Sequence, residues 1–352
     1  MNNARMGAAS LACALWGLAP AAFAQSSVSV YGIADAAVRY DHHSTNVASI
    51  DKSQLVSGGS AGSRLGFRGT EDLGGGLAAV FGLEMGLSLD DGQLRQGPGF
   101  GRQSWVGLQG DWGRVTAGRQ YNVLNGWWNN YNPLDDQWGI YWADPVYTGG
   151  DRFFQAYRYN NSLSYSNTLG PVKVQLDYAF GEAINHLRPG SSAGGSLVYA
   201  NGPVSVGTAF ARQHLADGDT RSDWTLGGKY SWEGGHYLSA GAMSTRQRNN
   251  DARYSIAFLG GGWRPTPLLL LSGAVYRFRQ NAGTTAGAGT AKSVAFVADY
   301  LLSKRTSLYA EIDRTVGKDG AARSTTAYWG LPTSGVTAMG RTGTMVGIRH
   351  RF

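Results

Sequence analysis

Apolar and polar side chains alternate with a period of two along most of this chain. In residues 172–180 every even position is apolar, and every odd position before Ala179 is charged or polar. Similar alternation runs through residues 64–68, 77–85 and 224–232. Successive side chains of a β-strand point to opposite faces, so this pattern predicts strands with one apolar and one polar face. The chain is therefore predicted to be all-β.

Short turns and long connections alternate between these strands. The short turns carry the Gly, Pro, Asn, Asp or Ser that turn dihedrals require, and they lie at residues 70–76, 110–113, 169–171, 200–203, 232–235, 264–267 and 302–305. The long connections cover residues 41–61, 89–99, 122–156, 182–193, 213–222, 247–253, 279–291 and 317–341. With a first strand from Val28 and a last strand ending at Phe352, the pattern gives sixteen strands. Short turns at one end and long loops at the other are typical of outer-membrane β-barrels.

A soluble β-sandwich would also alternate, but two features favour a barrel. The alternation persists over about sixteen strands with no second domain. Aromatic residues also gather at the short turns, as in the girdle of a membrane barrel, at Trp112, Tyr199, Trp232 and Trp263. We predict a sixteen-stranded antiparallel transmembrane β-barrel. In residues 255–263 and 268–272 both faces are apolar or small, and we interpret these strands as candidates for the border of a subunit interface.

The first 24 residues have the composition of an export signal. Arg5 precedes an apolar stretch from Met6 to about Leu18, and Ala22 and Ala24 fit an A-x-A-like cleavage site. The stretch is shorter than the roughly 20 residues that a membrane-spanning helix requires. We expect cleavage after Ala24, which would leave residues 25–352 as one barrel domain.

Composition agrees with a barrel and excludes several other classes of protein. The chain has 52 glycines and 11 tryptophans, yet its mean hydropathy is only −0.25. A helical membrane protein cannot be this polar, whereas a barrel needs apolar residues only on its lipid side. The net charge of +7 falls to +6 when Arg5 is removed with the signal, and the basic residues are dispersed, so we expect no nucleic-acid binding. Cys13, the only cysteine, lies in the signal, so the mature chain has no disulfide.

Five segments resemble the general porins of Gram-negative bacteria, in particular the beta-proteobacterial branch. They are residues 27–35, 63–77, 102–108, 118–121 and 347–352. The resemblance spans the mature chain and implies a homotrimeric sixteen-stranded barrel of the outer membrane that lets small hydrophilic solutes and ions diffuse passively. It also implies a third loop folded into the lumen, for which the longest connection, 122–156, is the candidate. The implied partners are the lipid bilayer, lipopolysaccharide and, through the terminal Phe352, the outer-membrane assembly machinery.

The resemblance places the basic side chains of a pore constriction at Arg64, Arg102 and Arg158, and we add Arg68 to this set. Strand parity puts all of them on the lumen side, together with Asp35, Arg39, Glu84, Lys173, Asp177 and Lys229. The third loop supplies Asp135 and Asp136, and later Asp144 and Asp151, so we expect a field between wall arginines and loop acids. Charged rings and pore diameter set the selectivity of pores. With a net charge of +6, the three arginines favour anions.

The third loop departs from the enterobacterial members of that family. Those relatives carry a Pro-Glu-Phe-Gly-Gly motif, whereas residues 132–136 read NPLDD and the loop is unusually aromatic. Trp127, Trp128, Trp138 and Trp142 are candidates for a track that stacks on sugars, which would make the protein a sugar-specific porin. Alternatively, these amphipathic rings pin the loop against the wall.

Enzymatic and metal-dependent functions find little support in the sequence. The six histidines form no H-x-H or H-E-x-x-H pair. We therefore expect no metal, no cofactor and no catalytic residue. A structural or adhesive barrel would explain the long loops equally well, but it does not explain the arginines expected in the lumen. Liposome swelling would discriminate between that barrel and a channel.

Overall fold

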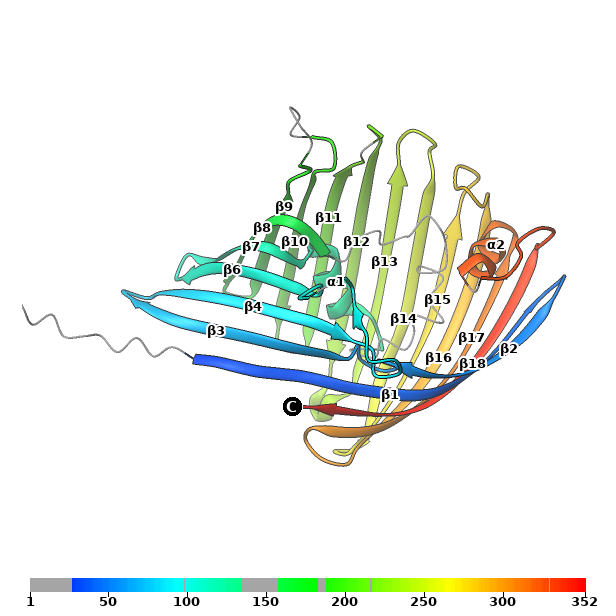
Figure 1. The fold of residues 1–352 in the computed structure, drawn as a ribbon, viewed down its shortest axis with the longest axis horizontal. Helices are drawn as coiled ribbons and strands as arrows, with labels where there is room; N and C mark the ends of the chain where they lie inside the picture. Colours follow the sequence, from blue (N-terminus) through cyan, green and yellow to red (C-terminus); the bar gives the residue numbers. More distant parts are fainter. Residues whose placement is uncertain (1–26, 98, 135–157, 183–187, 216, 329) are drawn as a thin grey trace, which may run out of the picture.

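The computed structural model describes residues 27–97, 99–134, 158–182, 188–215, 217–328 and 330–352. Its β-strands form one antiparallel sheet that closes on itself, because β1 (Ser27–Thr45) pairs from Ile33 to Thr45 with β18 (Ala338–Arg351). Figure 1 shows the strands following one another round the barrel from β1 in blue to β18 in red. Of the helices within the described residues, none is long and apolar enough to cross a membrane.

The remaining elements follow one another along the chain with short turns between alternate pairs. Their bounds are β2 (Ser49–Ser57), β3 (Arg64–Gly74), β4 (Leu77–Leu87), β5 (Leu94–Arg95), β6 (Gln103–Gly110), β7 (Gly113–Tyr121), α1 (Val123–Tyr131), β8 (Arg158–Leu169), β9 (Val172–Ala179), β10 (Ser192–Asn201), β11 (Val204–His214), β12 (Thr220–Ser231), η2 (Glu233–Gly235), β13 (Tyr237–Gln247), β14 (Arg253–Thr266), β15 (Leu269–Gln280), β16 (Gly289–Leu301), β17 (Thr306–Lys318) and α2 (Asp319–Tyr328).

The eighteen β segments amount to sixteen strands of the barrel wall. Both β2 and β3 pair with β1, β2 with its second half and β3 with its first half. In the same way both β5 and β6 pair with β4. Each pair is one wall strand that is interrupted, at residues 58–63 in one case and 96–102 in the other. The predicted number of sixteen strands is confirmed.

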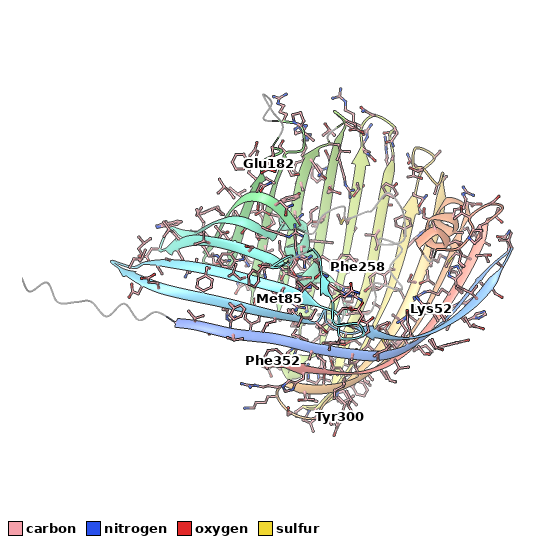
Figure 2. The ribbon with its side chains drawn as sticks, in the orientation of Figure 1. Lys52, Met85, Glu182, Phe258, Tyr300 and Phe352 are labelled. Atoms are coloured by element: carbon pink, nitrogen blue, oxygen red, sulfur yellow. The ribbon has the colours of Figure 1, made fainter. Side chains whose placement is uncertain are left out.

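The two faces of the wall differ as the alternation predicts. Large apolar side chains on the outer face remain exposed, and Leu226 retains 62% of its accessible surface. Its neighbours along β12, Thr225 and Gly227, point to the inner face and are buried. An outward apolar band of this kind suits contact with lipid. Figure 2 shows Tyr300 near the short-turn end and Glu182 at the opposite end.

All seven short turns join the strands that the sequence predicts, but several long connections are shorter than expected. The predicted loop 41–61 is mostly strand, because β1 continues to Thr45 and β2 begins at Ser49. The connections predicted at 213–222, 247–253 and 279–291 are likewise shortened by β11 to β16. The reason is that these strand ends carry polar residues on both faces. Alternation is lost there although backbone pairing continues.

Helix α1, in the third long connection, lies against the inner face of the barrel wall. Asn122 caps it, because its side chain accepts a hydrogen bond from the Asn125 amide at 3.0 Å. Trp127 Nε1 donates to the Gly207 carbonyl of β11 at 3.1 Å, and Tyr131 is fully buried. The described part of the third loop is thus folded inward, as predicted.

This helix explains the strands whose parity was ambiguous. Phe258 of β14 and Tyr276 of β15 point inward and pack with Trp127 and Trp128 in one buried apolar cluster. The second apolar face of β14 and β15 therefore packs against α1 inside the barrel. The interpretation of these strands as candidates for the border of a subunit interface concerns their outer face and stays a prediction.

A second helix inside the barrel was not predicted. Helix α2 lies in the connection expected as a loop at 317–341, and it contacts the wall strands β15 to β18. Ala321 and Ala322 are buried against that wall, and a Cβ on Gly317 would lie 3.3 Å from the Ala322 Cα. Small residues on both sides let the helix approach closely.

The seam of the barrel closes at the last residue. Gly32 and Phe352 exchange both backbone hydrogen bonds, at 3.0 and 3.1 Å. A Cβ on Gly32 would lie 2.3 Å from the Phe352 ring, so only glycine leaves room for this side chain. Figure 2 shows Phe352 at the short-turn end of the barrel.

Two adjacent glycines of β12 provide a test of how α1 is seated. A Cβ on Gly227 would lie 2.6 Å from the Tyr131 ring, whereas a Cβ on the outward Gly228 meets nothing closer than 3.7 Å. We expect Gly227→Val to push α1 away from the wall and to reduce single-channel conductance by about half or more. Gly228→Val is the matched control and should leave conductance unchanged. Equal conductance of the two variants would contradict the seating of α1.

Candidate functional site

Arg102 and Glu84 form a buried ion pair on the inner side of the wall. Arg102 lies at the end of the interruption 96–102, and its Nε donates to Glu84 at 2.6 Å. Glu84 is only 2% exposed and also accepts a hydrogen bond from Tyr31 at 3.0 Å. Glu84 lies opposite Gly66, which shares the inner face with Arg64 and Arg68.

The three predicted constriction arginines are brought together around Arg102. Its Nη2 donates to the Tyr121 hydroxyl at 2.8 Å, and Arg158 Nη2 donates to the same oxygen at 2.6 Å. Arg64 donates to the Gly62 carbonyl at 2.8 Å, and a Cβ on Gly62 would lie 3.2 Å from Arg102 Nη1. Three guanidinium groups from distant parts of the sequence thus share one short stretch of wall. We call Arg64, Arg102 and Arg158 the arginine cluster.

Tyr121 was not among the predicted site residues. It ends β7 directly before α1 and contributes the hydroxyl on which two of the arginines converge. The guanidinium of Arg158 also lies 4.3 Å from the centre of its ring. The sequence did place Tyr121 in the segment 118–121 that carries the resemblance. It gave no sign of this geometry, because the contacts join residues far apart along the chain.

Inner-face acids in the body of the wall are all buried. They are Asp35, Asp41, Glu84, Asp177, Asp223, Asp299, Glu311 and Asp313. Basic partners neutralise most of them, for example Arg349 with Asp299 at 2.6 Å and Arg221 with Asp223 at 3.2 Å. Asp177 accepts a hydrogen bond from Ser164 at 2.7 Å instead. These carboxylates therefore present little negative charge to water in the pore.

Asp35, Arg39, Glu84 and Asp177 were predicted to line the lumen, and this requires a correction. All four point to the inner side, but Asp35 and Arg39 are 0% exposed, Glu84 is 2% exposed and Asp177 is 5% exposed. The Asp35 carboxylate accepts hydrogen bonds from the amides of residues 59–61 at 2.7–3.1 Å and from Tyr309 at 2.6 Å. Arg39 lies in a buried network with Asp41, Glu311 and Asp313. Parity gave the correct face, but it does not reveal what covers a side chain.

Several inner-face bases, in contrast, are accessible to solvent. Arg68 and Lys173 are exposed, and Arg64 and Lys229 are partly exposed. No salt bridge joins Arg68, Lys173 or Lys229 to a carboxylate of the described residues. Arg114 of β7, which the sequence analysis missed, is also exposed on this face, with its guanidinium 5.6 Å from the Trp105 ring centre. The accessible charge of the described inner wall is therefore mainly positive.

The first two residues of the proposed aromatic track are not accessible to a sugar. Trp127 and Trp128 are 1% and 6% exposed, and their rings pack against Phe258. They anchor α1 to the wall, which is the alternative that the sequence left open, and they cannot stack on a sugar. Trp138 and Trp142 lie outside the described residues, as do Asp135, Asp136, Asp144 and Asp151. Within the described ranges, no group of three or more His, Cys, Asp or Glu is placed to hold a metal ion.

Comparison with known proteins gives consistent matches over nearly the whole chain. The family model described as Gram-negative porin matches residues 8–320. Outer membrane porin protein 32 of Delftia acidovorans is 33% identical over 97% of this chain and 99% of its own length. An outer membrane porin protein of Bordetella pertussis is 30% identical over 97% of this chain and 98% of its own. The solved structure of an anion-selective porin from Comamonas acidovorans aligns with a TM-score of 0.78 and 30% identity, covering 93% of this chain and 100% of that chain.

Replacing the carboxylate of Asp35 tests whether its hydrogen bonds to the amides of residues 59–61 stabilise the barrel. Asp35→Asn removes the charge that binds the amides of residues 59–61, so we expect the free energy of unfolding to fall by about 2–4 kcal/mol. Asp51→Asn is the control, because Asp51 sits on the outer face with its side chain 61% exposed. The midpoint urea concentration for unfolding from lipid vesicles measures both. Equal midpoints for the two variants would contradict the structural role of Asp35.

Proposed function

This chain belongs to the family of Gram-negative porins. From that premise we propose that its channel conducts anions more readily than cations. It is a porin of the outer membrane, whose barrel forms a channel for passive diffusion of small hydrophilic solutes and ions. The proposal concerns the sign of the charge that passes most easily. Arg and Lys side chains that line a pore favour anions, whereas rings of Asp and Glu favour cations.

One observation carries this proposal. On the inner face the acids are buried, whereas several bases are accessible to solvent. The acids in the body of the described wall are buried and bound to guanidinium groups, hydroxyls or backbone amides. The bases include Arg68 and Lys173, which are exposed, and neither has a salt bridge to a described carboxylate. A small anion entering the pore therefore meets positive groups whose charge is not compensated locally. A cation meets no comparable acid in the body of these wall strands, because the carboxylates there are buried and already bound.

The position of the arginine cluster supports the same conclusion. Helix α1 begins at Val123, two residues after the tyrosine on which Arg102 and Arg158 converge. The third loop therefore leaves the wall beside the cluster. The Comamonas acidovorans protein, which aligns over 93% of this chain, is described as an anion-selective porin. We propose that Arg64, Arg102 and Arg158 form the narrowest charged part of the channel, with Arg68 on the same face.

Assembly and surroundings belong to the same proposal. We propose a homotrimer, on the strength of the resemblance to general porins. The exposed apolar outer face supports contact with the bilayer and with lipopolysaccharide. Phe352, which completes the seam opposite Gly32, is proposed as the residue that the outer-membrane assembly machinery recognises. Signal cleavage after Ala24 remains a prediction, because residues 1–26 lie outside the described part of the chain.

Selectivity can be tested by removing charges from the two faces of the wall. We expect wild-type protein in a planar bilayer with a KCl gradient to give a reversal potential of the sign for chloride preference. Arg64→Ala with Arg102→Ala should lower the chloride to potassium permeability ratio several-fold, because the positive charge of Arg64 is lost and the Glu84 carboxylate loses the partner that neutralises it. Arg277→Ala with Arg279→Ala removes the same charge from the outer face and serves as the control. An unchanged ratio in the first double variant would contradict the assignment of the arginine cluster.

A further inference from the structure

The inner face of β1 to β7 carries a row of alternating aromatic and basic side chains on the short-turn side of the arginine cluster. They are Tyr31, Arg68, Trp105 and Arg114, and all four are exposed or partly exposed. We call these four residues the inner belt. Arg68 lies four residues after Arg64 along β3, which is about 13 Å farther toward the short turn. The inner belt is therefore separate from the arginine cluster.

Strand register places Arg68 and Trp105 in one line across the wall. Gly82 of β4 pairs with Arg68 on one side and with Trp105 on the other. A Cβ on Gly82 would lie 2.6 Å from the Trp105 ring, so the ring lies over Gly82 and leans toward β3. The guanidinium of Arg114, from β7, lies 5.6 Å from the centre of the same ring. Trp105 thus stands between two basic side chains, one on β3 and one on β7.

The other ring of the inner belt is seated in the same way. A Cβ on Gly66 would lie 2.4 Å from the Tyr31 ring, and the guanidinium of Arg68 lies 5.3 Å from the centre of that ring. The Tyr31 hydroxyl donates to Glu84 at 3.0 Å, which holds the ring against the wall. Glycines at two inner positions therefore let both rings lie close to the backbone, where any larger side chain would displace them into the lumen.

The positive charge of the inner belt is not neutralised by the described chain. Within the described residues no salt bridge joins Arg68 or Arg114 to a carboxylate. Glu84, two residues from Gly82 on β4, is buried and bound to Arg102. A cation–π contact holds a guanidinium near a ring but leaves its charge in place. The inner belt therefore offers accessible positive charge and aromatic surface within one stretch of wall.

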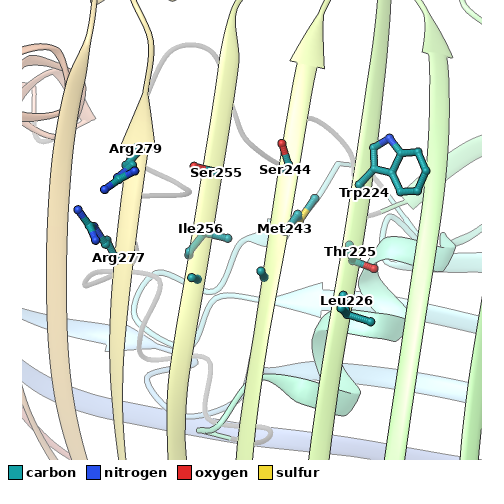
Figure 3. A pocket seen from close by; sticks show the side chains of 11 residues that line it. Trp224, Thr225, Leu226, Met243, Ser244, Ser255, Ile256, Arg277 and Arg279 are labelled. Carbon is teal, nitrogen blue, oxygen red and sulfur yellow. The ribbon is translucent and has the colours of Figure 1, made fainter.

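The outer face has the same residue types in a different arrangement. Figure 3 shows Arg277 and Arg279 at one end of a groove of about 480 Å³ and Trp224 at the other. The groove crosses from β12 to β15, so three strand spacings, or about 14 Å, separate the indole from the guanidinium groups. A ligand with a single ring and a single charge cannot reach both ends.

We propose that the inner belt binds aromatic carboxylates, which are anions with a carboxylate group on a flat ring. Guanidinium groups match a carboxylate with two parallel hydrogen bonds, and they also stack on aromatic faces. The carboxylate pairs with Arg68 or Arg114, and the ring packs against Trp105. A neutral sugar would leave both charges uncompensated, and an aliphatic acid would make no ring contact. The site rests on the proposed function in that the ligand reaches the inner belt through the channel.

Block of single-channel current by benzoate at pH 8 tests this site in planar bilayers. We expect benzoate to halve the mean KCl current at about fivefold lower concentration than cyclohexanecarboxylate, which has the same charge and nearly the same size but no aromatic ring. Benzyl alcohol, which lacks the charge, should not block. Because the inner belt lies on the short-turn side of the arginine cluster, benzoate should block faster when it is added to that side of the membrane.

Substitutions on the two faces of the wall locate the block. Trp105→Leu should raise the half-blocking concentration of benzoate about fivefold and leave that of cyclohexanecarboxylate unchanged, because Arg68 and Arg114 remain. Arg114→Gln should weaken block by both acids. The matched controls are Trp263→Leu, which removes an exposed indole from the outer face, and Arg277→Gln, which removes a charge from it. Both controls should be blocked as wild type is.

Three results would overturn the proposal. They are equal half-blocking concentrations of benzoate and cyclohexanecarboxylate on wild type, an unchanged benzoate block in Trp105→Leu, and equal block by benzyl alcohol, which would indicate a merely apolar site. The midpoint urea concentration for unfolding shows whether each variant is folded. If Trp105→Leu does not fold, an unchanged benzoate block in the exposed Arg114→Gln would overturn the proposal instead.

The reversal potential of the same wild-type channels in a KCl gradient separates this site from the proposed function. Potassium preference together with ring-dependent block by benzoate would contradict the anion preference and support the inner belt. Chloride preference without any difference between benzoate and cyclohexanecarboxylate would contradict the inner belt alone.

Discussion

Within a bilayer no water is available to the backbone, so every N–H and C=O group must find its partner in the protein. This chain meets that requirement by closing one antiparallel sheet, with β18 pairing to β1 and Phe352 exchanging two hydrogen bonds with Gly32. Ring closure fixes the direction of every side chain, since successive residues alternate between lipid and lumen.

The same constraint explains where the sheet is interrupted. At residues 58–63 the backbone leaves the ladder, and the amides of residues 59–61 bind the Asp35 carboxylate instead of a neighbouring strand. At residues 96–102 the interruption ends at Arg102, which turns inward to Glu84. Acids on the inner face thus hold the wall together and are withdrawn from the pore. Bases such as Arg68 and Lys173 hold no strand in place and stay accessible, so the accessible positive charge of the described inner wall follows from how that wall is built.

Much of this architecture could be predicted from local pattern alone. The seven turns, the sixteen strands and the outward position of Leu226 follow from turn residues and a period of two, which involve neighbours in sequence. The convergence of Arg102 and Arg158 on Tyr121 could not be predicted in this way, because it depends on contacts between distant segments. Burial of Asp35 and Arg39 was missed for a related reason: parity gives the face of a side chain but not its cover. Helix α2 was missed because small residues on a loop give no apolar stripe.

We propose that accessible positive charge on the inner wall, left uncompensated by the buried acids, sets the preference for anions. Anomalous diffraction from crystals soaked in rubidium bromide locates anions and cations in the same lumen. We expect bromide beside Arg64, Arg68 and Lys229, and no rubidium at the buried carboxylates such as Glu84 and Asp177. Rubidium along that wall, with no bromide at the accessible bases, would contradict it.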